Sequence, residues 1–350
     1  MSPEEEVAVE ERKTILDVRD LRVSFETAQG TVYAVRDVSF HVEEGEILGI
    51  VGESGSGKSV SMYAVMGLLA ANGLVTDGDI VFQGEPIAPG AFADAKTYEK
   101  RMCGLRGQAM AMIFQNPMTY LNPVLPVGRQ LREMILNHHP QLGRAEANRR
   151  AVEQLHLVGV PSPETVIRQY PYALSGGMRQ RIITAIALVN RPRLIIADEP
   201  TTSLDVTTQS QVLDLLKKMS RQTHAAAIVV SHDLGVVAGL CDRVAIMYGG
   251  QIVETGSVRE IFYAPGHPYT KGLLHCVSHP EAEDKTLIPI PGSPPNMLHP
   301  PAGCPFVDRC DEAMHICMKE MPQATALSET HSCFCWLGEK KRREEVRQHG

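Results

Sequence analysis

Three segments whose residue types suit phosphate chemistry occur in a fixed order along the chain. GESGSGKS occupies residues 52–59, LSGGM residues 174–178, and LIIADEP residues 194–200. A glycine-rich loop that ends in Lys-Ser is typical of sites that hold a triphosphate, and an acidic pair after a buried strand is typical of sites that hold Mg²⁺. The first and third segments together indicate a nucleoside triphosphatase.

The glycine-rich segment follows an apolar strand predicted over 46–51 and precedes a helix predicted over 58–69, which is the context that a P-loop requires. Lys58 is expected to contact the β- and γ-phosphates, and Ser59 to bind Mg²⁺. Glycines let backbone amides turn inward around phosphate oxygens. We therefore expect the amides of the loop to surround the phosphates of ATP, with contributions from Gly52, Ser54, Gly55, Ser56 and Gly57.

Four further side chains are candidates for the chemistry of hydrolysis. Asp198 ends a buried strand, where we expect it to hold Mg²⁺, and Glu199 is placed to orient or deprotonate the attacking water. His232 follows a second buried strand, AAIVVS over 226–231, and can bond the γ-phosphate through a neutral imidazole. Gln115 follows the segment AMIF, where its amide can contact Mg²⁺ or the attacking water.

The LSGGM segment predicts a second anion site in the same chain. Ser175 is a good N-cap for the helix that follows, and the amides of Gly176 and Gly177 are exposed at its start. Because the chain already has one complete phosphate loop, this turn is expected to serve a nucleotide held mainly by another molecule. Asp205, in the string Ser-Leu-Asp, is expected at the same seam.

Composition excludes some classes of protein. The chain has 350 residues, 43% hydrophobic and 21% charged, with a formal net charge of −7. This acidic balance argues against a protein that coats nucleic acid, so no nucleic-acid partner is expected. Residues 2–12 carry five glutamates, unlike a signal peptide, and the longest apolar runs are far shorter than a membrane span. We expect a cytosolic chain that reaches the membrane through a partner.

Hydrophobic periodicity predicts an α/β architecture with several parts. Residues 1–13 read as a disordered acidic lead. Strand-like alternation over 15–42 predicts an antiparallel β subdomain. Alternating buried strands and helices from 194 onward favour a mostly parallel sheet. Most of the helical signal lies at about 96–190, as an insertion. The ATPase domain is predicted over 14–265, and a proline-rich and cysteine-rich C-terminal extension over 266–350.

Five of the eight cysteines fall between Cys304 and Cys335, which predicts a metal site in a chain expected to be cytosolic. Cys304, Cys310 and Cys317, followed by Cys333 or Cys335, would supply four thiolates. Soft sulfur ligands favour an iron–sulfur cluster or Zn²⁺. The spacing lacks the paired C-x2-C knuckles that are usual for structural zinc.

The order of these motifs resembles that of the ATP-binding-cassette (ABC) ATPase family, over residues 15–265. The resemblance assigns Walker A, the Q-loop, the signature, Walker B, the D-loop and the H-loop to the segments described above. It implies two ATP molecules sandwiched head-to-tail between two such domains. Phe25 matches the aromatic residue that stacks on adenine, with Tyr33 as the substitute, and Met178 departs from the glutamine common in the family.

Two C-terminal segments resemble the oligopeptide/dipeptide importer subfamily: PGHPYTKGLL over 265–274 and GCPFVDRC over 303–310. This resemblance implies a peptide-importing complex at the cytoplasmic face of the cell membrane. The implied partners are a second, homologous ATPase subunit, two transmembrane permeases and a peptide-binding protein. It also implies a 4Fe–4S cluster on Cys304, Cys310, Cys317 and Cys335, since His331 lies at the family's spacing before the last cysteine.

Rival interpretations remain at this stage. The cargo of a complex in this subfamily could instead be nickel, haem or an opine. A soluble DNA-repair or translation-associated cassette ATPase is the alternative from another class, but such proteins usually hold two cassettes or long insertions. This chain has one cassette and carries the HPYT string at 267–270.

Overall fold

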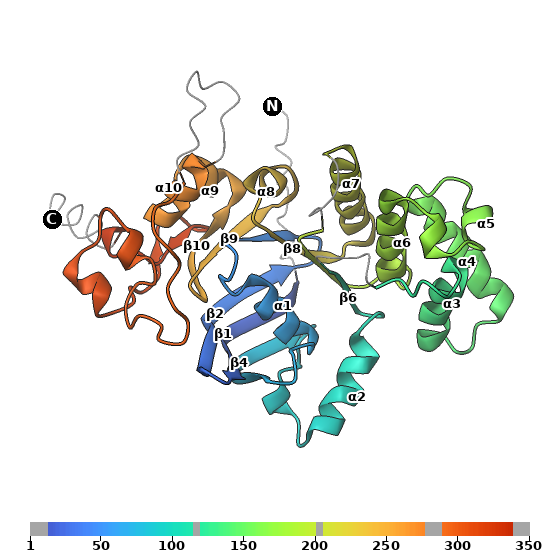
Figure 1. The fold of residues 1–350 in the computed structure, drawn as a ribbon, viewed down its shortest axis with the longest axis horizontal. Coiled ribbons are helices and arrows are strands. Elements are labelled where there is room, and N and C mark those ends of the chain that lie inside the picture. The colour runs from blue at the N-terminus through green and yellow to red at the C-terminus, as the bar shows by residue number, and fades with distance from the viewer. Residues whose placement is uncertain (1–12, 115–119, 201–205, 277–288, 339–350) are drawn as a thin grey trace, which may run out of the picture.

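The computed structural model describes residues 13–114, 120–200, 206–276 and 289–338, and two β-sheets organise them (Figure 1). The smaller sheet is antiparallel and has the strand order β2-β1-β4-β5. The antiparallel subdomain expected from the sequence is therefore confirmed. Its strands are β1 Thr14–Thr27, β2 Gly30–Glu43, β4 Gly73–Phe82 and β5 Glu85–Pro86.

The larger sheet has eight strands in the order β11-β12-β10-β9-β3-β8-β7-β6. Its five strands from β9 to β6 are parallel to one another, and β10, β12 and β11 add an antiparallel edge. Every residue of β3, β7 and β8 is buried, which explains their continuous apolar runs. The strands are β3 Ile47–Val51, β6 Met110–Ile113, β7 Leu194–Asp198, β8 Ala226–Ser231, β9 Arg243–Tyr248, β10 Gln251–Ser257, β11 Thr325–Ala326 and β12 Ser332–Cys333.

Helices join these strands as crossovers and form a separate group at one end (Figure 1). In the described residues they are α1 Lys58–Met66, α2 Ala95–Leu105, α3 Val127–His138, α4 Arg144–Leu157, α5 Pro163–Val166, α6 Gly176–Leu188, α7 Val206–Thr223, α8 Leu234–Leu240, α9 Val258–Tyr263 and α10 Pro268–His275.

Helices α3 to α6 share a hydrophobic core of their own, which includes Leu131, Leu155 and Ile182. Helix α2 belongs elsewhere, because Met102 and Leu105 pack into the core that the antiparallel sheet shares with one face of the large sheet. Strand β6 pairs with β7 in the large sheet. The helices with a common core thus occupy the later part of the segment 96–190.

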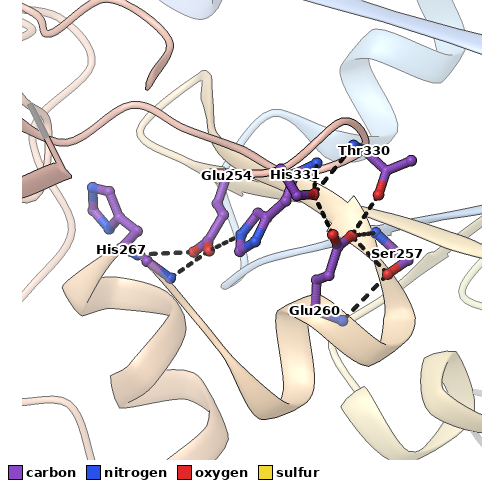
Figure 2. A network of polar contacts seen from close by, with 8 residues as sticks. Glu254, Ser257, Glu260, His267, Thr330 and His331 are labelled. Atoms are coloured by element: carbon purple, nitrogen blue, oxygen red, sulfur yellow. Dashed lines mark hydrogen bonds and ion pairs between the residues drawn. The ribbon is translucent and has the colours of Figure 1, made fainter. Parts of the chain in front are cut away.

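The C-terminal extension continues the large sheet, which the sequence patterns did not predict. Strand β12 pairs with β10 through Glu254 and Cys333. The Glu254 side chain is fully buried and accepts hydrogen bonds from the backbone amides of Gly266 and His267, at 2.6 and 3.0 Å. Its carboxylate also lies 2.7 Å from Nε2 of His331, as Figure 2 shows.

A second carboxylate supports the same junction (Figure 2). Glu260 caps its own helix by accepting from the backbone amide and hydroxyl of Ser257, at 2.9 and 2.7 Å. It also accepts from the hydroxyls of Thr330, at 2.8 Å, and of Ser328. Two acidic side chains of β10 and α9 therefore hold the segment 328–333 in place.

We expect Glu254→Ala to detach this junction. Three buried donors would lose their acceptor, so the free energy of unfolding should fall by about 3 kcal/mol or more. Urea denaturation measures this loss, and limited proteolysis should then cut within 320–338. Glu133→Ala removes an exposed pair with Arg129 and is the control, expected to cost less than about 1 kcal/mol. Equal denaturation midpoints for the two variants would show that the junction is not important for stability.

Candidate functional site

Three parallel strands bring the predicted phosphate residues to one edge of the large sheet. Val51 of β3 is paired with Ser231 of β8, and Asp198 of β7 is paired with Val230 of the same strand. The P-loop and His232 begin immediately after β3 and β8, and the acidic pair starts at Asp198, the last residue of β7. The carboxyl edge of a parallel sheet is where ligands bind in open α/β folds.

The P-loop connects β3 to α1 and needs glycine at its two ends. A Cβ atom on Gly52 would stand 2.1 Å from the carbonyl oxygen of Met247, which no side chain tolerates. Gly57, the N-cap of α1, has φ +99°, and a Cβ there would meet the carbonyl oxygen of Ala34 at 2.6 Å. No side chain caps α1, so its first amides are free to meet an anion.

Lys58 is folded onto the loop that carries it. Its ammonium is buried and donates to the carbonyl oxygens of Gly52 and Glu53, at 2.8 and 2.9 Å. Burial lowers the pKa of Lys58, and the nearby carboxylates of Glu199, Asp198 and Glu53 oppose that shift. A triphosphate would replace these carbonyl contacts with charged ones.

Ser59 and Asp198 are in direct contact, as a shared Mg²⁺ site requires. The hydroxyl of Ser59 donates to Oδ1 of Asp198 at 2.8 Å, and Asp198 is 1% exposed. Burial raises the pKa of Asp198, partly offset by this hydrogen bond. The other carboxylate oxygen, Oδ2, is buried without a partner in the described residues. A hydroxyl oxygen beside an unsatisfied carboxylate oxygen is a donor set that fits Mg²⁺.

Glu199 and His232 also meet. Nδ1 of His232 lies 3.2 Å from Oε1 of Glu199. Glu199 adopts a left-handed backbone with φ +46°, and its amide donates to the carbonyl oxygen of Val230 at 2.9 Å. A non-glycine residue keeps such a costly backbone conformation only where the surrounding structure holds it, and residues of this kind are often found at functional sites. The pair is placed to act on one water molecule.

The signature turn lies on the helical group and not on the edge with the P-loop. Ser175 is the N-cap of α6, and its hydroxyl accepts from the amide of Met178 at 3.3 Å. The amides of Gly176 and Gly177 begin the helix. The predicted N-cap is therefore confirmed, and the helix start is available as an anion site.

Two predicted site residues, Gln115 and Asp205, lie outside the described residues. The two candidates for stacking on adenine lie on neighbouring strands. Phe25 of β1 is partly buried opposite Gly73, where a Cβ would stand 2.6 Å from its ring. Tyr33 of β2 is 46% exposed and lines a shallow surface cavity with Arg22 and Arg36.

The predicted cysteine ligands gather around one cavity. Cys304, Cys310, Cys317 and Cys335 all line it, together with His267 and Trp336. The backbone brings two of them together, because the amide of Cys304 donates to the carbonyl oxygen of Cys317 at 2.8 Å. Cys333 is absent from the lining. A hydrogen bond from Cys333 lowers the pKa of Cys335, whereas burial raises the pKa of Cys304 and of Cys310.

His267 adds an unpartnered polar atom to this cavity. Its Nδ1 accepts from the amide of Tyr269 at 3.0 Å, so the proton of the neutral ring is on Nε2. That Nε2 is buried and has no partner in the described residues. Burial lowers the pKa of His267 to about 3, so the ring stays neutral.

In the described part of the chain, no group of three or more His, Cys, Asp or Glu side chains is placed to hold a metal ion. None of the helices in that part combines the length and apolar character that a membrane crossing requires.

Sequence patterns did not place two residues of the extension at the P-loop. The hydroxyl oxygen of Tyr269 accepts from the amide of Glu53 at 2.9 Å, and Arg309 forms an ion pair with the Glu53 carboxylate at 2.8 Å. Both residues lie in segments that resemble the importer subfamily, but nothing local in them indicates a contact 200 or more residues away. Only the fold reveals it.

Comparison with known proteins identifies two matching family models. The ABC transporter model matches residues 35–202, and the model of the oligopeptide/dipeptide transporter C-terminal region matches residues 253–317. The chain is 46% identical to the dipeptide transport ATP-binding protein DppD of Bacillus subtilis, over 95% of this chain and 97% of that protein. It is 47% identical to the oligopeptide transport ATP-binding protein OppD of Escherichia coli, over 90% and 91%.

Solved structures agree with the fold. A dimeric structure of the bacterial ABC transporter cassette MJ0796 superposes with a TM-score of 0.61 at 25% identity, over 70% of this chain and 99% of that chain. A post-hydrolysis dimer of the same cassette, bound to ADP and Pi, superposes equally well. The motifs, the sheet edge that joins them and these matches show that the chain belongs to the ABC transporter ATP-binding family, in the branch of the dipeptide and oligopeptide transport ATP-binding proteins.

Proposed function

We propose that this chain is the ATP-hydrolysing subunit of an importer of dipeptides and oligopeptides at the cytoplasmic face of the cell membrane. The observation that carries the proposal is the assembly of Lys58, Ser59, Asp198, Glu199 and His232 at one sheet edge. The names of the relatives support the cargo. The matched C-terminal region supports the same branch of transporters.

ATP would bind with its phosphates on the P-loop and Lys58, and with Mg²⁺ between Ser59 and Asp198. Phe25 is our candidate for stacking on adenine, with Tyr33 as the alternative. Glu199 would take a proton from the attacking water while His232 orients it and bonds the γ-phosphate. Gln115 and Asp205 keep the roles expected from their motifs, at the metal and at the subunit seam.

The site would be completed by a second subunit. The turn from Ser175 to Gly177 would bind the γ-phosphate of a nucleotide on the partner's P-loop, and the dimeric MJ0796 structures support such pairing. The second subunit is proposed to be a homologous ATPase, giving a heterodimer. ATP drives closure only if it binds the closed pair better than the open one.

An apolar groove beside the Q-loop segment supports docking of a permease. Met112 of the large sheet and Ile183 of the helical group line it, as do Phe114 and Tyr120. Phe114 and Tyr120 flank residues 115–119 in the sequence. Their rings stack with centroids 4.3 Å apart, and Tyr120 is 54% exposed. A cytoplasmic segment of each of two permeases would bind such a groove, and a peptide-binding protein would deliver the cargo.

We also propose a 4Fe–4S cluster held by Cys304, Cys310, Cys317 and Cys335. All four thiols line one cavity, as the ligands of a cluster would; the described side chains are not placed around a single ion, and Zn²⁺ would require four sulfurs about 2.3 Å from one point. The unpartnered N–H of His267 fits too, because cluster sulfurs accept hydrogen bonds. When bound, the cluster would join three loops of the extension and could carry one electron.

Replacing Asp198 with Asn tests the metal role. The variant should still bind ATP in EDTA, but the gain in affinity on adding Mg²⁺ should fall by about tenfold or more, because the anionic ligand is lost. Isothermal titration with and without Mg²⁺ measures this gain. Asp79→Asn, on the exposed face of β4, should behave like the wild type. An undiminished gain for Asp198→Asn would place the metal elsewhere.

Replacing Glu199 with Gln in the complete transporter tests the function itself. ATP should bind, whereas phosphate release and uptake of a labelled dipeptide into proteoliposomes should both fall by about 100-fold or more. Glu153→Gln on the exposed face of α4 is the matched control. Wild-type turnover by Glu199→Gln would refute its role, and a wild-type complex that takes up nickel or haem but no peptide would refute the cargo.

Anaerobically purified protein should contain about four iron atoms and four acid-labile sulfide ions per chain. Both should be lost in Cys304→Ser and retained in Cys103→Ser, whose thiol is exposed. Zinc without iron would contradict the cluster.

The variant His267→Asn keeps a helix cap but removes the Nε2–H group. It should therefore lower the reduction potential of the cluster, measured by EPR titration. An unchanged potential would contradict the hydrogen bond to the cluster.

A further inference from the structure

One side chain of the C-terminal extension makes an ion pair inside the nucleotide site. Arg309 directly precedes Cys310, and its side chain is 5% exposed. Nη1 and Nη2 donate to the two carboxylate oxygens of Glu53, at 2.8 and 3.1 Å. Glu53 is the second residue of the P-loop, so this bidentate pair connects the cysteine-bearing region to the loop that holds phosphate.

The remaining donors of Arg309 are also satisfied, which fixes the guanidinium in place. Nη1 bonds the hydroxyl of Tyr248 at 3.0 Å, Nη2 the carbonyl oxygen of Ile290 at 3.0 Å, and Nε that of Pro291 at 2.8 Å. The group also lies 5.6 Å from the ring centre of Tyr248. A guanidinium held this firmly is an anchor and not a mobile surface charge.

A second contact fixes the backbone of the same P-loop residue. Tyr269, fully buried on α10, accepts from the amide of Glu53 at 2.9 Å. Its ring lies 4.5 Å from that of Tyr248. The extension therefore holds both the amide and the carboxylate of Glu53, while the carbonyl oxygen of Glu53 accepts from Lys58.

The charge on Glu53 makes this arrangement matter for binding. A carboxylate in a phosphate-binding loop repels a triphosphate unless a cation compensates it. Glu53 is close enough to Lys58 to act on the ammonium electrostatically. Without Arg309 the carboxylate would be free to pair with Lys58, the side chain that the phosphates need.

We propose that Arg309 is a positioning residue for ATP binding. It neutralises Glu53 and, with Tyr269, fixes the first turn of the P-loop, so the C-terminal extension sets the affinity of the site for MgATP. The inference rests on the proposed function only in taking ATP as the ligand. It concerns how tightly the nucleotide binds and not the chemical step.

The test is a double-mutant cycle on Arg309 and Glu53. MgATP affinity is measured on the full chain, and KM and kcat on the assembled transporter. Arg309→Met should weaken MgATP binding about tenfold and raise KM, with kcat at saturating ATP within about twofold of the wild type. The MgATP affinity of Arg309→Lys should lie between those of the wild type and Arg309→Met, because lysine keeps the charge but cannot form the bidentate pair. The double variant Arg309→Met with Glu53→Gln should recover most of the lost affinity, since the unpaired carboxylate is gone.

Salt and a matched control separate electrostatics from packing. The defect of Arg309→Met should shrink between 0.05 and 0.5 M salt, because the Debye length falls from about 14 to about 4 Å over that range. Arg149→Met, which removes only exposed pairs on α4, should bind MgATP like the wild type. Should Arg309→Met not fold, Glu53→Gln alone remains decisive, and it should bind MgATP at least as tightly as the wild type.

Three results would overturn the inference: wild-type affinity in Arg309→Met, no recovery in the double variant, or weakened binding in Glu53→Gln. Failure of the proposed function would look different from these three results. If the proposed function were wrong, the wild-type chain itself would not bind MgATP, or the wild-type complex would not couple hydrolysis to uptake.

Discussion

A buried ammonium and a buried carboxylate at one sheet edge are the constraint on which the rest of the nucleotide site depends. Lys58 has only uncharged oxygens as hydrogen-bond partners, and Asp198 has one oxygen without a partner in the described residues. Burial acts against the charged form of both, lowering one pKa and raising the other. Phosphate and Mg²⁺ would supply the missing opposite charges, so the charges of this site complement those of MgATP.

The same edge explains why one molecule is proposed to be insufficient. Residues that bind phosphate, metal and water follow three strands whose register fixes them together, whereas Ser175 begins a helix in a group with a core of its own. We expect an anion-binding turn carried on a separately packed unit to shift relative to the P-loop when nucleotide binds. Such a shift would change the contacts of the subunit with a permease.

Short sequence patterns were sufficient to predict those features of the fold that depend on neighbouring residues in the chain. Continuous apolar runs indicated β3, β7 and β8, and the residues after them gave the P-loop, Asp198, Glu199 and His232, which the structure places at one edge. Ser175 was predicted as an N-cap and is one. Spacing and resemblance predicted four cysteine ligands, with Cys335 as the fourth; these four line one cavity, and their role as ligands stays a prediction.

What could not be predicted depends on pairs far apart in sequence. Glu254 and His331, or Glu53 and Arg309, look like ordinary polar residues in any window of the chain, because a charge becomes structural only when the fold buries it beside its partner. The position of α2 is a similar case, since its apolar stripe fits either core. Propensity and periodicity describe single elements, and they carry no information about which distant element supplies the other half of a contact.

The C-terminal extension then has a physical reason to influence a site that other chains build without it. Its strands continue the large sheet at β10, and its buried junction at Glu254 leaves α10 and the loop of Arg309 a fixed distance from the P-loop. Anything that orders the cysteine cavity also orders Cys310 and hence Arg309, the residue beside it. The Arg309–Glu53 ion pair and the Tyr269–Glu53 hydrogen bond therefore join the C-terminal extension directly to the P-loop, without a long path through the domain.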